Sequence, residues 1–178
     1  YRYGFKDIEK SEVLTDKYEK DSYLGYEDNA ILPGLRKFLR DMNGTTNDPL
    51  MLGIFTVSSH SPYKTPATFK KKLLSHDRSE NDYLNSVRYV DNFLKMLFLE
   101  LNENGINKSN TIFVLTGDHG QAFGKHQEYL HGSIHEDSTW VPTILYGNMV
   151  KERFSSKDKI TGIRRSVDIV PTIYDLLS

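Results

Sequence analysis

The order of two apolar runs, with a long periodic segment between them, constrains the fold of this chain most. Residues 50–57, LMLGIFTV, form a continuous apolar run between polar turns, which is typical of a strand buried on both faces. Residues 79–105 repeat apolar side chains at helical spacing, and a second apolar run, TIFVLTG, follows at 111–117. Because a strand, helix and strand in this order favour parallel neighbours, we expect an α/β fold with a mainly parallel sheet sandwiched between helices.

Other segments extend this pattern. Asp28 is expected to cap a helix that runs from Ile31 to a stop at Gly44, with a start blurred by Pro33. The run VPTILYG at 141–147 predicts another buried strand, and Ser166 is expected to cap a helix that ends the chain. The side chains expected to face the core from the long helix are Leu84, Val87, Val90, Leu94, Leu97 and Leu101.

Composition excludes several classes of function. The net charge is −1, with both signs interspersed, so no basic stripe indicates a nucleic-acid surface. The apolar runs are far shorter than the roughly 20 residues of a membrane helix, so no membrane span is expected in this chain. There is no cysteine, which excludes disulfides and thiolate ligands but leaves the redox compartment open.

The chain shows no internal repeat and no convincing linker. Residues 1–27 lack a clear period and predict an irregular lead-in, whereas 28–178 are interpreted as one domain or part of one. Because the sequence begins at Tyr1 without a targeting segment, we expect it to be a piece of something longer.

The polar residues that follow the second apolar run carry the strongest chemical signal. Asp118, His119 and Gly120 come directly after that predicted strand, at the sheet edge where parallel α/β folds bind ligands. A carboxylate and an imidazole are ligands that a hard or borderline divalent cation accepts. The alternative for an isolated pair is that Asp118 caps a turn and His119 is merely exposed.

Other histidines strengthen the metal or anion interpretation. His60 follows the first apolar run in SSHSPY, in a loop stiffened by prolines. His131 is the best candidate downstream, then His126, then His135, although each fits a solvated loop histidine too. The nearby acidic residues that we interpret as surface charge are Glu128, Glu136 and Asp137.

Four blocks, taken in order, resemble one family. They are HSPY at 60–63, the helix DYLNSVRYVDNFLKMLFLEL leading into NTIFVLTGDHGQAFGKH, His131-Gly132 followed by EDSTWVP, and the closing SVDIVPTIYDLL. Over about residues 25–178 the chain resembles the sulfatase family of the alkaline-phosphatase superfamily, which includes arylsulfatases and bacterial phosphoethanolamine and phosphoglycerol transferases. The resemblance implies an alkaline-phosphatase-like fold, of which this chain is the C-terminal half of the catalytic domain.

The resemblance also implies roles for the site residues. Asp118 and His119 would bind a divalent metal ion, which is calcium in typical sulfatases and zinc, manganese or magnesium in the phospho-transfer relatives. His60 and His131 would be catalytic residues that contact the sulfate or phosphate ester, and His126 would join them in binding the substrate. Family members mostly act outside the cytoplasm, secreted or in lysosomes.

The family's nucleophile is missing from these residues. It is a formylglycine made from Cys or Ser in a C/S-x-P-x-R motif, or a Thr or Ser in the transferases. In this sequence no proline has Cys or Ser two residues before it and Arg two residues after it. Thr116 is expected to serve packing and local hydrogen bonding. We therefore expect the nucleophile and further acidic ligands in an upstream N-terminal half.

Three hypotheses follow. The first is a fragment of a metal-dependent sulfatase-family enzyme. The transferases are slightly favoured within the family, because the metal-ligand pair is Asp118-His119 and because the segment GYEDNAILPGLRKFL resembles their sequences more. The second is a non-catalytic anion- or metal-binding module, a pseudoenzyme on the same fold. The third is an unrelated α/β protein, which a structure lacking adjacent parallel strands at Val57 and Gly117 would favour.

Overall fold

The structure is a computed structural model that describes residues 18–22, 25–42, 49–154, 160 and 162–178. Most of the predicted lead-in and the predicted stop at Gly44 lie outside these described residues. Backbone contacts group the chain into two compact units, residues 1–104 (unit 1) and 105–178 (unit 2), and each is taken by itself below.

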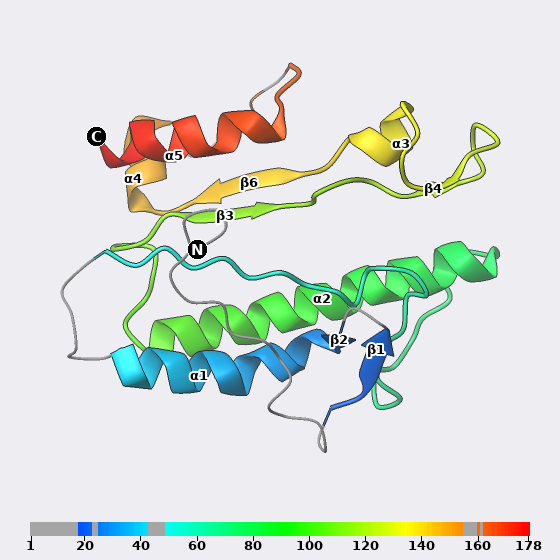
Figure 1. Cartoon of the computed structure of the whole chain (residues 1–178), viewed down its shortest axis with the longest axis horizontal. Coiled ribbons are helices and arrows are strands. Elements are labelled where there is room, and N and C mark those ends of the chain that lie inside the picture. The colour runs from blue at the N-terminus through cyan, green and yellow to red at the C-terminus, as the bar shows by residue number, and fades with distance from the viewer. Residues whose placement is uncertain (1–17, 23–24, 43–48, 155–159, 161) are drawn as a thin grey trace. The chain divides into compact units, whose positions relative to one another are not determined.

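Unit 1 is built on two helices. A short antiparallel pair, β1 (Lys20–Ser22) and β2 (Gly25–Tyr26), leads into the 3₁₀ turn η3 (Asp28–Ala30), then α1 (Ile31–Met42) and, further along, α2 (Arg78–Glu103). Figure 1 shows α1 lying alongside α2. The long helix begins just before the predicted Ser79, because the Asp77 carboxylate accepts a hydrogen bond of 2.8 Å from the Glu80 amide and so caps it.

The core of unit 1 lies between these helices. Its buried side chains are Leu35 and Leu39 from α1, with Tyr89, Phe93, Leu97 and Leu101 from α2. The predicted stripe on α2 is therefore only partly right: Leu97 and Leu101 are buried, but Val87 is 41% exposed. Aromatic rings bury more area than Val or Leu, so the face that carries Tyr89 and Phe93 turns inward.

A charged pair also connects the two helices. The Arg36 guanidinium of α1 donates from Nε at 3.0 Å to each carboxylate oxygen of Glu100 in α2, and from its terminal nitrogen at 2.5 Å to one of them. Glu100 is buried, and hydrogen bonds from Arg36 hold its pKa below the ordinary value. The pairing is bidentate and fixes the register of α1 on α2.

The strand predicted over residues 50–57 does not form among the described residues. The segment is irregular, and its side chains are not buried on both faces: Met51 is 67% exposed and Phe55 is 84% exposed. A central strand depends on neighbours that complete its hydrogen-bond ladder and on helices that cover its faces. Within the described part of the chain no strand pairs with this run, so its apolar sequence alone does not produce a strand.

Unit 2 contains the strand that precedes the candidate site. Strand β3 (Phe113–Thr116) pairs with β6 (Thr143–Tyr146), and the hairpin β4 (Ala122–Phe123) to β5 (Tyr129–Leu130) lies between them in sequence. Three helices and a 3₁₀ turn complete the unit: α3 (Glu136–Thr139), α4 (Asn148–Arg153), η4 (Ser166–Asp168) and α5 (Ile169–Leu177). Figure 1 shows α4 and α5 next to the β3–β6 ribbon.

The predicted strands at 111–117 and 141–147 thus form, but they pair antiparallel, with Phe113 opposite Tyr146 and Thr116 opposite Thr143. The burial predicted for 141–147 is wrong, because Ile144 is 54% exposed and Tyr146 is 46% exposed. The sheets of the described residues are all two-stranded and antiparallel, so a mainly parallel sheet is not shown there. Over the same residues, no helix has the length and apolar character needed to cross a bilayer.

Candidate functional site

The turn after β3 is held tightly against the segment around α3. Gly117 lies where an added Cβ would meet a Val141 side-chain carbon at 3.1 Å, and Gly120 where it would meet the Asp137 carbonyl oxygen at 2.1 Å. The Gly120 amide donates a 2.8 Å hydrogen bond to the Ser138 carbonyl. Gly120 therefore permits a backbone approach that a side chain would prevent, Gly117 permits close packing against Val141, and Asp118 and His119 lie between the two glycines.

Asp118 and His119 form a compact pair of donors at this turn. The side chain of Asp118 is 90% exposed, and its Oδ1 accepts a 2.9 Å hydrogen bond from the His119 amide. His119 Nδ1 lies 2.8 Å from the Gly120 carbonyl, which can only accept, so Nδ1 carries the hydrogen and Nε2 has the lone pair of the neutral ring. His119 Nε2 and Asp118 Oδ2 are 3.8 Å apart.

This pair fits part of a cation's coordination shell. Two ligands of one ion, each at about 2.1 Å, lie at most about 4.2 Å apart, and the 3.8 Å between Oδ2 and Nε2 falls inside that limit. Carboxylate oxygen and imidazole nitrogen suit a divalent cation. Within the described residues, however, no group of three or more His, Asp or Glu side chains converges on a common point.

The four histidines of this region stack in two pairs. The His119 and His131 rings have centroids 4.3 Å apart with planes at 33°, and the His126 and His135 rings are 4.3 Å apart at 20°. Because the lone pair of an imidazole lies in its ring plane, rings stacked in this way do not aim both nitrogens at one ion between them. The structure thus brings His131 beside the metal-ligand candidate His119 and places His126 with His135.

His126 also has a carboxylate partner. Its Nε2 lies 3.5 Å from Oδ1 of Asp137, whose side chain is only 17% exposed. Our interpretation of Asp137 as surface charge missed this contact, since His126 lies in the turn of the β4–β5 hairpin whereas Asp137 lies after the hairpin, in α3. The same residue supplies the carbonyl that contacts Gly120, so the start of α3 connects His126 with the turn that carries Asp118 and His119.

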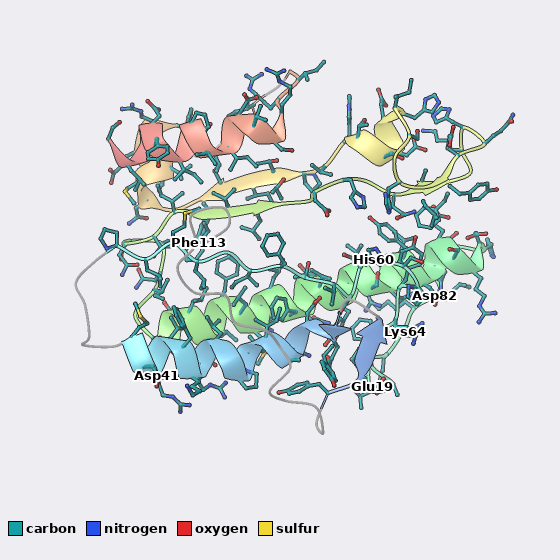
Figure 2. The ribbon with its side chains drawn as sticks, viewed as in Figure 1. Glu19, Asp41, His60, Lys64, Asp82 and Phe113 are labelled. Carbon is teal, nitrogen blue, oxygen red and sulfur yellow. The ribbon has the colours of Figure 1, made fainter. Side chains whose placement is uncertain are left out.

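His60 lies in unit 1, in the loop that follows the irregular apolar segment 50–57 (Figure 2). Its amide donates to the Val57 carbonyl at 2.9 Å, and its own carbonyl accepts from the Tyr63 amide at 2.8 Å. Ring atom Nδ1 lies 2.7 Å from the Ser61 carbonyl, so, as in His119, Nδ1 carries the hydrogen. The backbone on both sides of this imidazole is therefore fixed.

Asp28 is a second residue whose role the sequence did not reveal. We expected Asp28 to cap α1, and this prediction is wrong. The side chain is fully buried, and its Oδ1 accepts hydrogen bonds from the Val57 amide at 2.7 Å and the Ser58 amide at 3.3 Å. An Asp before a helical pattern is usually a cap, so the sequence offered no signal for this longer-range contact. The prediction for Thr116 is only partly right: its hydroxyl donates a local hydrogen bond to the Gly117 carbonyl and lies 3.0 Å from the Thr143 hydroxyl on β6, but the side chain is exposed and so does not serve packing in a buried strand.

Comparison with known proteins identifies the family. A family model described as Sulfatase matches residues 2–178. An arylsulfatase of Clostridium perfringens (strain 13 / Type A) is 32% identical over 101 residues, which cover 55% of this chain and 20% of the relative. Arylsulfatase K of Canis lupus familiaris is 30% identical over 67 residues, 38% of this chain and 12% of the relative.

A solved structure supports the fold class. A protein in the alkaline phosphatase superfamily from Vibrio parahaemolyticus superposes with a TM-score of 0.51 at 22% identity, covering 71% of this chain and 28% of that one. This likeness supports the α/β class. The match to the family model argues against the hypothesis of an unrelated protein, even though Val57 and Gly117 do not lie on adjacent parallel strands. Since the family match extends over nearly the whole chain, the protein belongs to the sulfatase family of the alkaline phosphatase superfamily.

Proposed function

We propose that this chain supplies the metal- and leaving-group-binding part of an enzyme that cleaves or transfers a sulfate or phosphate ester. The observation that carries the proposal is the Asp118–His119 pair, whose Oδ2 and Nε2 lie 3.8 Å apart at the end of β3. Membership of the sulfatase family and the arylsulfatase relatives favour a sulfuric ester hydrolase. The transferase alternative keeps a phosphate ester as substrate.

Asp118 and His119 would hold a divalent cation, either calcium or one of zinc, manganese and magnesium. Once bound, the cation would supply positive charge against the ester oxygens, where negative charge grows in the transition state. The chain's own contribution is to orient the two donors. The Gly120 carbonyl fixes the His119 tautomer so that Nε2 can act as the ligand, and the His119 amide fixes the Asp118 carboxylate.

His60 and His131 are proposed to contact the ester oxygens, and either, when protonated on both ring nitrogens, could donate a proton to the leaving oxygen as a general acid. His60 suits this role because its Nδ1 is held by Ser61, which directs chemistry to Nε2. His131 suits it because its ring lies against the metal-ligand candidate His119. His126, paired with Asp137, is proposed to contribute to substrate binding.

The nucleophile is proposed to come from elsewhere in the natural protein. These residues contain no cysteine, and the chain spans about a fifth or less of the length of the curated arylsulfatases that it matches. An N-terminal half would also supply further acidic ligands and the mainly parallel sheet of the family. By the same family argument, we propose an extracytoplasmic, secreted or lysosomal location.

The sharpest test replaces Asp118 with Ala in the intact protein. Because the side chain is 90% exposed, D118A should keep the melting temperature that the wild type has in the absence of metal. It should lose bound metal, and it should cleave para-nitrophenyl sulfate and bis-para-nitrophenyl phosphate at least about a hundredfold more slowly. Asp91→Ala, at an exposed carboxylate on α2, is the matched control and should behave as the wild type.

The outcomes separate the hypotheses. Full activity of D118A would refute the assignment of Asp118 as a ligand. Metal binding by the wild type without turnover of either ester would favour the non-catalytic anion- or metal-binding module. Adding back calcium, zinc, manganese or magnesium to stripped enzyme identifies the cation, and the faster of the two esters distinguishes sulfatase from phospho-transfer chemistry.

A further inference from the structure

Asp28 is a fully buried carboxylate in the 3₁₀ turn η3, just before α1. Its Oδ1 accepts hydrogen bonds from the amides of Val57 and Ser58, at 2.7 and 3.3 Å. In return, the Ser58 hydroxyl, also fully buried, accepts from the Asp28 amide at 3.2 Å. These three bonds join two segments 30 residues apart into one clamp, which we call the Asp28 clamp.

The Asp28 clamp leads directly to His60. The Val57 amide donates a hydrogen bond to the Asp28 carboxylate, and the Val57 carbonyl accepts one from the His60 amide at 2.9 Å. On the other side, the His60 carbonyl accepts from Tyr63, whose ring is buried and packs edge-on against Tyr83 at 5.5 Å. The turn that carries the imidazole is therefore fixed at both ends, and Asp28 fixes the first of them.

Burying a carboxylate costs free energy, because its charge loses hydration. Burial raises the pKa of Asp28, although the hydrogen bonds from Val57 and Ser58 oppose that change. Within the described residues, Oδ2 has no hydrogen-bond partner at all. An apolar side chain would fill the same space without this cost but would leave two backbone amides unsatisfied, so the acceptor is what the site requires.

We propose that Asp28 is a positioning residue for His60: it fixes the turn 57–60 so that the imidazole keeps the direction needed at the ester. This inference rests on the proposed function, in which His60 contacts the substrate. It assigns Asp28 no contact with the ester. Its effect on the reaction passes entirely through the backbone of Val57 and Ser58.

The preceding residue in the chain offers a matched control. The Glu27 carboxylate, also buried, accepts a hydrogen bond from the Tyr89 hydroxyl in the core of unit 1. This bond fastens the same stretch of chain to α2 but makes no contact with the turn 57–60. Tyr89→Phe should therefore lower stability without changing the geometry of His60, which separates stability from positioning.

The experiment measures kcat, KM and melting temperature of the intact protein for D28N, D28L, Y89F, H60A and the double variant D28L/H60A, with the faster of para-nitrophenyl sulfate and bis-para-nitrophenyl phosphate. D28L has the same branching and the same number of heavy atoms but no acceptor, and we expect kcat to fall about tenfold to a hundredfold. D28N should recover most of that loss, because an amide oxygen accepts the same two bonds. Y89F should lose stability and keep its kcat.

The double variant decides how Asp28 acts. If the effect passes through His60, D28L should cost no further activity once His60 is replaced by Ala. Wild-type kcat in D28L, equal losses in D28L and Y89F, or a full additional loss in D28L/H60A would each overturn the inference. Full activity of H60A is a different result, since it refutes the proposed role of His60 itself.

Should D28L fail to accumulate as folded protein, Ser58→Ala gives a milder form of the same test. It removes only the hydroxyl that accepts from the Asp28 amide. We expect a smaller fall in kcat than for D28L, again absent in an H60A background. An unchanged kcat in S58A, with the same fold, would count against the Asp28 clamp.

Discussion

Gly120 shows how much one missing side chain contributes to the candidate site. Its amide donates to the Ser138 carbonyl at 2.8 Å, and an added Cβ would lie 2.1 Å from the Asp137 carbonyl oxygen. That distance is far inside van der Waals contact with a backbone atom, which cannot rotate away as a side chain can. Gly120→Ala must therefore push the Asp118–His119 turn away from α3.

We expect G120A to lower the free energy of unfolding by about 1–3 kcal/mol and to weaken metal binding, as measured by denaturant unfolding and metal titration. Gly34→Ala is the matched control, because nothing lies within 4 Å of a Cβ added there in α1. It should raise stability by about 0.5–1 kcal/mol, as is usual for Gly to Ala in a helix. Equal stability of G120A and the wild type would contradict this account of the turn.

At the level of residues, the sequence predicts best what is local. Asp118 and His119 follow a strand directly, so their place at its end was predictable from the apolar run TIFVLTG. The contact of His126 with Asp137 was not, because it depends on a hairpin in which Gln127 and Leu130 adopt positive φ values of 60° and 67°. Neither residue type favours that conformation, so Gly124, at a φ of 86°, is a turn signal in this loop but does not reveal its full course.

At the level of elements, the pair Arg36–Glu100 is the clearest electrostatic contribution to the fold, since it joins α1 to α2. Hydrogen bonds from Arg36 lower the pKa of Glu100 from its ordinary 4.5. A carboxylate with a depressed folded-state pKa contributes stability that is fully present above the unfolded pKa. That stability is lost as the pH falls through the folded pKa.

We therefore expect Glu100→Gln to lower the melting temperature at neutral pH, and the difference from the wild type to shrink as the pH falls below 4.5. Thermal unfolding followed by circular dichroism from neutral to acidic pH measures it. The control is Asp41→Asn, in the exposed pair Lys37–Asp41 of α1, where solvent screens the charges and little should change. A pH-independent difference for E100Q would mean that packing, and not charge, explains the loss.

Helices and strands that follow from the pattern of their own side chains were predicted well. Features that depend on a neighbouring strand were not. Helices α1, α2 and α5 follow from their apolar periodicity, and β3 and β6 from short apolar runs between turns. The run at 50–57 has the same composition as a buried strand, but a strand also requires a ladder partner, which no periodicity supplies. The direction in which β3 and β6 pair was likewise beyond the pattern.

For the molecule as a whole, the uneven packing predicts uneven protection from solvent. The α2 residues Phe93 and Leu97 lie in the core of unit 1, whereas the run 50–56 is irregular and carries Met51 and Phe55 exposed. In the 178-residue chain we expect amide hydrogens of 50–56 to exchange rapidly and those in the middle of α2 slowly, as measured by mass spectrometry.

The Val57 amide provides the internal check, because it donates to buried Asp28 and should exchange more slowly than its neighbours in the run. Uniformly strong protection across 50–56 would contradict the irregular conformation described for it. The family was predictable from the order of the four sequence blocks. The missing ladder partner was not, because it is a property of the whole assembly of strands.

The contacts of Glu27 with Tyr89 and of Asp28 with Ser58 also determine the order in which unit 1 can assemble during synthesis. Ser58 lies 30 residues after Asp28, whereas Tyr89 lies 62 residues after Glu27. At about 5–20 residues per second, the ribosome delivers the first partner within about 1.5–6 seconds and the second within about 3–12 seconds. The turn that carries His60 can thus close before α2 exists, and the helix then fastens a loop that is already shaped.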